Sequence, residues 1–130
     1  MALVTPLPFR RPTSIKVVSR TYSVEEWDER EAAASSYYGR LLEKDARIQV
    51  DASLPSADWA RTFQHEVIHA IFREMGLSIQ EKILHNLDEE DVTHRIANGL
   101  TAVYQDNPWF LGFMAESFGL EARLEGHGSA

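Results

Sequence analysis

Two stretches of the chain repeat apolar residues at helical spacing, and both predict amphipathic helices. The first covers residues 57–75, where Ser56 is a plausible N-cap and Gly76 a plausible C-terminal stop. The second covers residues 89–104, opens with acidic residues that suit the helix dipole, and ends before Pro108. The apolar stripes are Trp59, Phe63, Val67, Ala70, Ile71 and Met75 in the first helix, and Val92, Ile96, Leu100 and Val103 in the second.

The face of the second helix opposite its apolar stripe is unusual. It carries Glu90, His94, Ala97 and Thr101 at helical spacing. The small side chains of Ala97 and Thr101 would let another helix approach closely. We therefore expect this helix to be buried on both sides.

Shorter apolar runs predict a small sheet. Residues 14–22 contain a β-branched run typical of a first strand. Residues 36–42 and 47–51 are separated by the polar Glu43-Lys44-Asp45, which indicates a β-hairpin. A hairpin that leads into the first helix would give that helix a sheet to lie on. We expect the two tyrosines at its start, Tyr37 and Tyr38, to pack in this sheet rather than act on substrate.

Three other segments give weaker patterns. Ser23 followed by Glu26 forms a capping-box pattern that predicts a helix or, alternatively, an irregular excursion after the first strand. Residues 77–87 fit a short helical turn, and residues 109–120 are apolar enough to pack as a final short helix.

These elements predict an α+β fold in one domain, because a chain of 130 residues with 44% hydrophobic residues can bury one modest core. We expect a proline-punctuated extended segment at 1–13, a folded domain at 14–124 and a flexible tail at 125–130. The expected architecture is a small antiparallel sheet or hairpin packed on the two amphipathic helices.

Charge and composition exclude several function classes. A net charge of −7 argues against a nucleic-acid-binding surface, which needs clustered lysine and arginine. The chain has no cysteine, so it forms neither a disulfide framework nor a thiolate metal site. No apolar run has the length of about 20 residues that spans a bilayer, and the arginines follow the first apolar residues, the reverse of a signal peptide. We expect a cytoplasmic protein without membrane contact.

The chemistry of the chain is concentrated in the first helix, in the sequence HExxH. His65 and His69 are four residues apart, so their imidazoles lie on one face and can bind one zinc ion. Glu66 lies between them as a carboxylate that can take a proton from a metal-bound water. The motif supplies two zinc ligands and a general base, and a catalytic zinc site needs a third protein ligand.

Two familiar sources of that ligand do not match the chain. The extended HExxHxxGxxH form would need glycine and histidine where Phe72 and Met75 stand, and a downstream ExxxD helix is absent. The remaining candidates lie at the start of the second helix: His94 and Glu90 above all, then Glu89 or Asp91, or no protein ligand. Glu90 and Asn98, each four residues from His94, would be natural partners for its free ring nitrogen.

The segments FQHEVIHAI and VTHRIANGLTAVYQDNP resemble the small zincin-like metallopeptidases of phages and prophages, a group related to ImmA/IrrE. The resemblance covers roughly residues 38–108. In that family a glutamate three residues before Ala-Asn completes the metal site, and here that position is His94. The resemblance implies a three-histidine zinc site of His65, His69 and His94, and a cytoplasmic protein of a bacterium or a phage-infected cell.

The function that these residues predict is a zinc-dependent peptidase with Glu66 as general base and a peptide or protein as substrate. The substrate could add as an extended strand at the hairpin edge. Tyr104 and His85 are candidate oxyanion donors, whereas His127 in the tail is expected to be solvated. The alternatives are a non-catalytic, zinc-stapled binding or assembly module and a domain without any metal.

Overall fold

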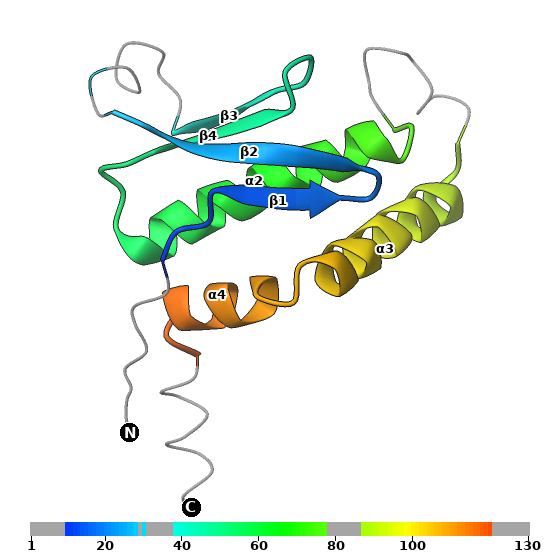
Figure 1. The fold of residues 1–130 in the computed structure, drawn as a ribbon. Coiled ribbons are helices and arrows are strands. Elements are labelled where there is room, and N and C mark those ends of the chain that lie inside the picture. The colour runs from blue at the N-terminus through cyan, green and yellow to red at the C-terminus, as the bar shows by residue number, and fades with distance from the viewer. Residues whose placement is uncertain (1–9, 29, 31–37, 78–86, 121–130) are drawn as a thin grey trace, which may run out of the picture.

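The computed structural model describes residues 10–28, 30, 38–77 and 87–120. These residues form an α+β domain, which confirms the predicted fold class (Figure 1). The short turn predicted within 77–87, most of the segment at 1–13, Tyr37 and the tail at 125–130 lie outside the described residues, and so do His85 and His127. The elements are β1 (Ser14–Val17), β2 (Arg20–Trp27), β3 (Gly39–Leu42), β4 (Arg47–Asp51), α2 (Ser56–Glu74), α3 (Glu89–Asp106) and α4 (Phe110–Ser117).

The described strands form one sheet in the order β1-β2-β4-β3, with β3 at an edge. The β1–β2 and β3–β4 pairs are antiparallel, and the second of these is the predicted hairpin. The β2–β4 pair is parallel, with Val24 opposite Ile48, so the sheet is mixed and the expected antiparallel sheet was wrong on this point.

The parallel pair is formed by β2. The segment from Ser23, predicted as a helix or an irregular excursion, is part of this strand, so both alternatives were wrong. Tyr22 and Val24 are buried, while Ser23 and Glu25 are only partly buried, so side chains alternate along this strand. The capping-box pattern misled because Tyr22 and Val24 fill the core from alternate positions, and this burial overrides a local cap pattern. The first predicted strand is also divided, because Val18 adopts a φ of 61° and starts the turn from β1 into β2.

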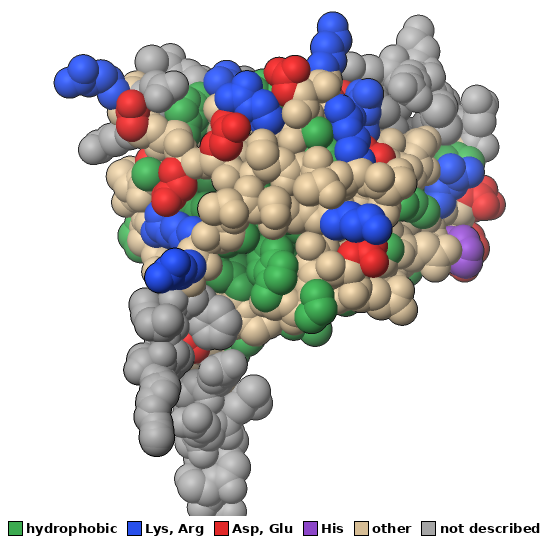
Figure 2. Space-filling view, in the orientation of Figure 1, with side chains coloured by type: hydrophobic (Ala, Val, Ile, Leu, Met, Phe, Trp, Pro, Cys, Tyr) green, Lys and Arg blue, Asp and Glu red, His purple; other side chains and the backbone are tan. Residues whose placement is uncertain are grey.

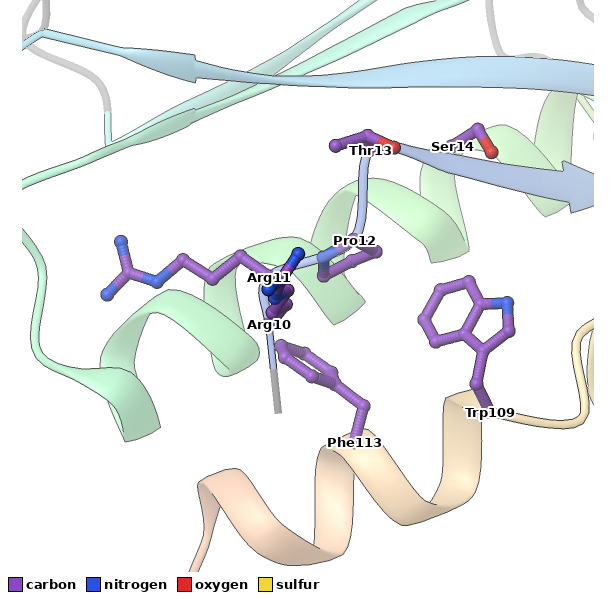
Figure 3. A pocket seen from close by; sticks show the side chains of 7 residues that line it. All are labelled: Arg10, Arg11, Pro12, Thr13, Ser14, Trp109 and Phe113. Atoms are coloured by element: carbon purple, nitrogen blue, oxygen red, sulfur yellow. The ribbon is translucent and has the colours of Figure 1, made fainter. Parts of the chain in front are cut away.

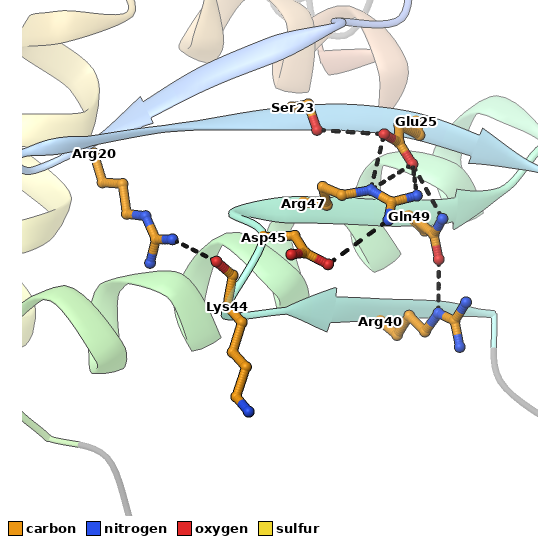
Figure 4. Close-up of polar contacts among 8 residues, drawn as sticks. All are labelled: Arg20, Ser23, Glu25, Arg40, Lys44, Asp45, Arg47 and Gln49. Atoms are coloured by element: carbon orange, nitrogen blue, oxygen red, sulfur yellow. Dashed lines mark hydrogen bonds and ion pairs between the residues drawn. The ribbon is translucent and has the colours of Figure 1, made fainter.

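A polar network ties β2 to the hairpin (Figure 4). Arg47 donates to both carboxylate oxygens of Glu25, and the Gln49 side chain donates to one of them at 3.1 Å. Arg40 in turn donates to Gln49 at 2.6 Å and lies 4.3 Å from the Trp27 ring centroid. These contacts hold the edge strand β3 in place against the rest of the sheet.

Helix α2 lies across the sheet and buries its apolar stripe as predicted (Figure 1). Trp59 and Phe63 are fully buried and meet the α4 ring of Phe113 at centroid distances of 5.9 and 6.1 Å. The helix starts at Ser56 without a side-chain cap, so the predicted Ser56 cap was wrong. Gly76 follows with a φ of 72°, which confirms it as the residue that stops the helix.

Helix α3 packs on α2 through its predicted apolar side, where Gly99 lies between Ile96 and Val103, and the additional helix contact expected on its opposite face is absent among the described residues. A Cβ at Gly99 would lie 2.5 Å from Ile71 Cγ2, so glycine is what lets the two helices approach. Gly99 is five residues after His94 and therefore lies on another side of the helix. The face predicted to be buried is exposed at all four positions, Glu90, His94, Ala97 and Thr101.

The C-terminal end of α3 is fixed to the sheet by one side chain. Asn107 is 4% exposed; its amide donates to the Lys16 carbonyl at 2.7 Å and accepts from the Lys16 amide at 3.0 Å. This exchange imitates strand pairing. It also positions α4, whose Phe110, Phe113 and Met114 belong to the core. Among the described helices none is long and apolar enough to cross a bilayer.

Candidate active site

The two histidines of the HExxH sequence lie side by side on α2. Their Nε2 atoms are 3.1 Å apart, and their ring centroids are separated by 4.7 Å with the planes at 73°. Both side chains are exposed, because they lie on the helix face turned away from the core. The two ring nitrogens thus lie close together, as their spacing predicted, and their role as metal ligands stays a prediction.

This geometry fits two ligands of one zinc ion. Two Zn–N bonds of about 2.0–2.1 Å at a tetrahedral angle separate their nitrogens by about 3.3 Å, close to the 3.1 Å observed. The same distance also suits a hydrogen bond between neutral rings. Burial, and next the neighbouring His65, lower the pKa of His69, while Glu43 partly opposes this. A lowered pKa favours the neutral imidazole that binds a metal.

Glu66 is also on α2, but its side chain is buried, with 6% of its surface exposed, whereas those of the two histidines are exposed. Burial raises the pKa of its carboxyl to about 7. The physical cause is desolvation, which penalises the charged form. A carboxyl with a pKa near the working pH is suited to accept and return a proton.

Gly39 at the start of β3 is what allows the sheet to approach this carboxylate. A Cβ at Gly39 would lie 2.6 Å from Thr62 Cγ2 and 3.5 Å from Glu66 Oε2. The glycine therefore brings the edge strand against α2 at the level of Glu66. A larger residue at this position would force the Thr62 side chain, the strand or the helix to shift.

We expect Gly39→Ala to lower the free energy of unfolding by about 1–3 kcal/mol, because overpacking forces backbone shifts. Urea unfolding followed by circular dichroism measures this change. The double variant Gly39→Ala with Thr62→Ser is the matched control, since serine lacks the Cγ2 atom that causes the clash. It should recover part of the loss. Equal stability of Gly39→Ala and wild type would contradict the close approach.

A pocket of about 300 Å³ opens between β3 and α2, and we call it the Glu66 pocket. The pocket brings Glu66 and His65 together with the edge strand. Its described lining residues are Tyr38, Gly39, Arg61, Thr62, His65 and Glu66. Sequence reasoning missed this role for Tyr38, which is 68% exposed rather than packed in the sheet. It also missed Arg61, although its spacing of four residues from His65 was visible in the sequence.

The structure does not bring His94 to the histidine pair. Among the described residues, no group of three or more histidine, aspartate or glutamate side chains is arranged to hold a metal ion. His94 is exposed on α3, and its Nε2 lies 3.2 Å from the Asn98 amide nitrogen, the expected neighbour. The alternative ligands Glu89 and Glu90 are exposed too, and Asp91 belongs to the capping box with Asp88. The third ligand stays a prediction.

Glu43 lies near the histidine pair, whereas Tyr104 does not line the Glu66 pocket. Glu43, which the sequence placed in the hairpin turn, is close enough to influence the pKa of His69 and forms an ion pair with Arg73 at 2.6 Å. Tyr104, a candidate oxyanion donor, instead stacks against Phe110 at a centroid distance of 5.9 Å and is not among the residues that line the Glu66 pocket. The other candidate donor, His85, lies outside the described residues.

A second cavity, of about 410 Å³, lies between residues 10–14 and α4 (Figure 3). Trp109, which precedes α4, and Phe113 of α4 project toward the chain segment that enters β1. Arg11 is held there by Glu26 at 2.8 Å and by the Ala52 and Leu54 carbonyls. None of the residues that the sequence singled out for chemistry lines this cavity.

Basic and acidic side chains are interspersed on the described part of the face in Figure 2.

In comparisons with protein-family models, curated proteins and solved structures, nothing matches this chain. The resemblance to the zincin-like group therefore stays a prediction that rests on the motif residues.

Proposed function

We propose that this protein is a zinc-dependent peptidase. The observation that carries the proposal is the pair of Nε2 atoms at 3.1 Å on His65 and His69, next to the buried Glu66 at an open pocket. His65 and His69 would hold the ion. When bound, zinc polarises a carbonyl and lowers the pKa of a coordinated water to about 7.

The chain's own groups supply the remaining parts of the reaction. Glu66 accepts a proton from the attacking water and passes it to the leaving amine. Strand β3 lies at one edge of the described sheet, so an extended peptide can pair with it and reach the Glu66 pocket. Gly39 keeps that approach free of side-chain atoms. The proposed substrate is therefore an extended segment of a peptide or protein.

His94 enters the proposal as the third ligand on the sequence alone, from its face of the second helix and from the resemblance. Its exposed position on α3 gives that role no support, and the same holds for the alternative Glu90. The position of Tyr104, the candidate oxyanion donor among the described residues, outside the Glu66 pocket favours the second candidate function, a non-catalytic zinc-stapled module for binding or assembly. Both functions are proposed for a cytoplasmic protein of a bacterium or a phage-infected cell.

The proposal is tested with untagged protein that has been stripped of metal and then supplied with zinc. Casein is incubated with both forms, and fragments are identified by mass spectrometry. We expect cleavage only by the zinc-loaded form. Cleavage of equal extent by the stripped form would contradict the metal mechanism, and zinc binding without any cleavage would favour the binding module.

A further inference from the structure

Among the described residues, the Glu66 pocket is lined by one positively charged side chain, that of Arg61. Arg61 lies one helical turn before His65 on α2 and lines the pocket together with Tyr38 and Thr62. It is the only lysine or arginine among the described residues that line it. The chain has 20 acidic and 13 basic residues, so a basic residue at this place is not explained by a generally basic surface.

The Arg61 guanidinium keeps most of its hydrogen-bonding capacity. One nitrogen, Nη1, contacts Asp58 at 2.7 Å, in an i,i+3 pair whose side chains are 67% and 50% exposed. Exposed pairs of this kind are weak. A guanidinium has five N–H donors, and the described residues offer Arg61 no acceptor besides Asp58. The other N–H donors of Arg61 therefore have no acceptor among the described residues.

The other side chains that line the pocket are compatible with the binding of one negatively charged group of a ligand. Its only acidic lining residue among those described is Glu66, which is buried and 6% exposed. Tyr38 and Thr62 add hydroxyl groups, and Tyr38 is 68% exposed, so its ring is available to a ligand. Arginine is the side chain best suited to bind a carboxylate with two parallel hydrogen bonds.

We infer that the Glu66 pocket recognises a substrate carboxylate close to the scissile bond, and that Arg61 is the residue that binds it. The inference rests on the proposed peptidase function, because it places this carboxylate beside Glu66. The carboxylate has two sources in a peptide: an aspartate or glutamate side chain, or the free C-terminus. The first makes the enzyme specific for acidic sequences, and the second makes it a carboxypeptidase.

Binding is measured in a Glu66→Gln background, so that the result does not depend on catalysis. Three fluorescein-labelled alanine peptides are the probes: one with a single glutamate and an amidated C-terminus, one with glutamine in its place, and the glutamine peptide with a free C-terminus. Fluorescence anisotropy gives the dissociation constants. We expect at least one carboxylate peptide to bind roughly tenfold more tightly than the neutral one.

Adding Arg61→Gln should remove that preference, whereas Arg61→Lys should keep part of it because the charge remains without the planar fork. Lys44→Gln, which removes a charge from the hairpin turn, is the matched control and should leave the preference unchanged. Circular dichroism checks that every variant is folded. The glutamate peptide and the free C-terminus separate the two sources of the carboxylate.

Equal binding of all three peptides, no binding of any of them, or a preference that survives Arg61→Gln would overturn the inference. Failure of the proposed function gives a different result, since wild type would then cleave no peptide with zinc while the carboxylate preference of the Glu66→Gln protein persisted. Cleavage without any preference for a carboxylate would leave the peptidase standing and remove the role of Arg61.

Discussion

Replacing Glu66 with glutamine should reduce zinc-dependent peptide hydrolysis by roughly 10²- to 10⁴-fold, the usual contribution of a positioned general base. Glutamine keeps the size of the side chain but does not accept a proton. Burial raises the pKa of this carboxyl to about 7, so it is suited to exchange protons at neutral pH. The initial rate of casein cleavage at saturating zinc measures the loss.

Glu74→Gln is the matched control, because it makes the same change on the same helix away from the Glu66 pocket. Its carboxylate accepts a hydrogen bond from Tyr22 at 2.6 Å and belongs to the packing of α2 on β2. Its rate should stay close to that of wild type at a temperature where both are folded. Equal activity of Glu66→Gln and wild type would reject the proposed mechanism.

The single variants His65→Ala and His69→Ala should each weaken zinc binding by more than roughly 100-fold. Changing a residue that merely supports a ligand already weakens binding by about 10- to 100-fold, so losing a ligand should exceed that. Both side chains are exposed, so neither variant should lose much packing. Competition with a zinc-binding dye measures the affinity.

The same titration decides the third ligand. A strong loss in His94→Ala would support the three-histidine site despite the exposed position of His94, and full affinity would reject it. Glu90→Gln tests the alternative in the same way. His65→Ala with unchanged affinity would show that the pair on α2 is not a metal site.

Helical periodicity predicted most of the fold because each helix has a strong internal pattern. The stripe from Trp59 to Met75 and the stop at Gly76 specify α2 within the sequence itself. The parallel pairing of β2 with β4 could not be predicted, since it depends on contacts between segments more than 20 residues apart. The segment after Ser23 also shows that a local cap pattern is overridden when alternate side chains fill a core.

The candidate site also has one part that the sequence predicts and another part that depends on the fold. His65, Glu66 and His69 follow from spacing within one helix, so the sequence was sufficient to find them. Tyr38 and Gly39 join the pocket only because β3 packs on α2, and no local pattern reports that contact. His94 was favoured because small residues on its face suggested a helix contact. The contact is made by Gly99 on another side of α3 instead.

A crystal structure of zinc-soaked protein, with data collected at the zinc absorption edge, tests the central claim most directly. The account predicts one anomalous peak at about 2.0–2.1 Å from the Nε2 atoms of both His65 and His69, with a water on the side of Glu66. Rings that stay in direct contact at 3.1 Å with no peak between them would contradict it.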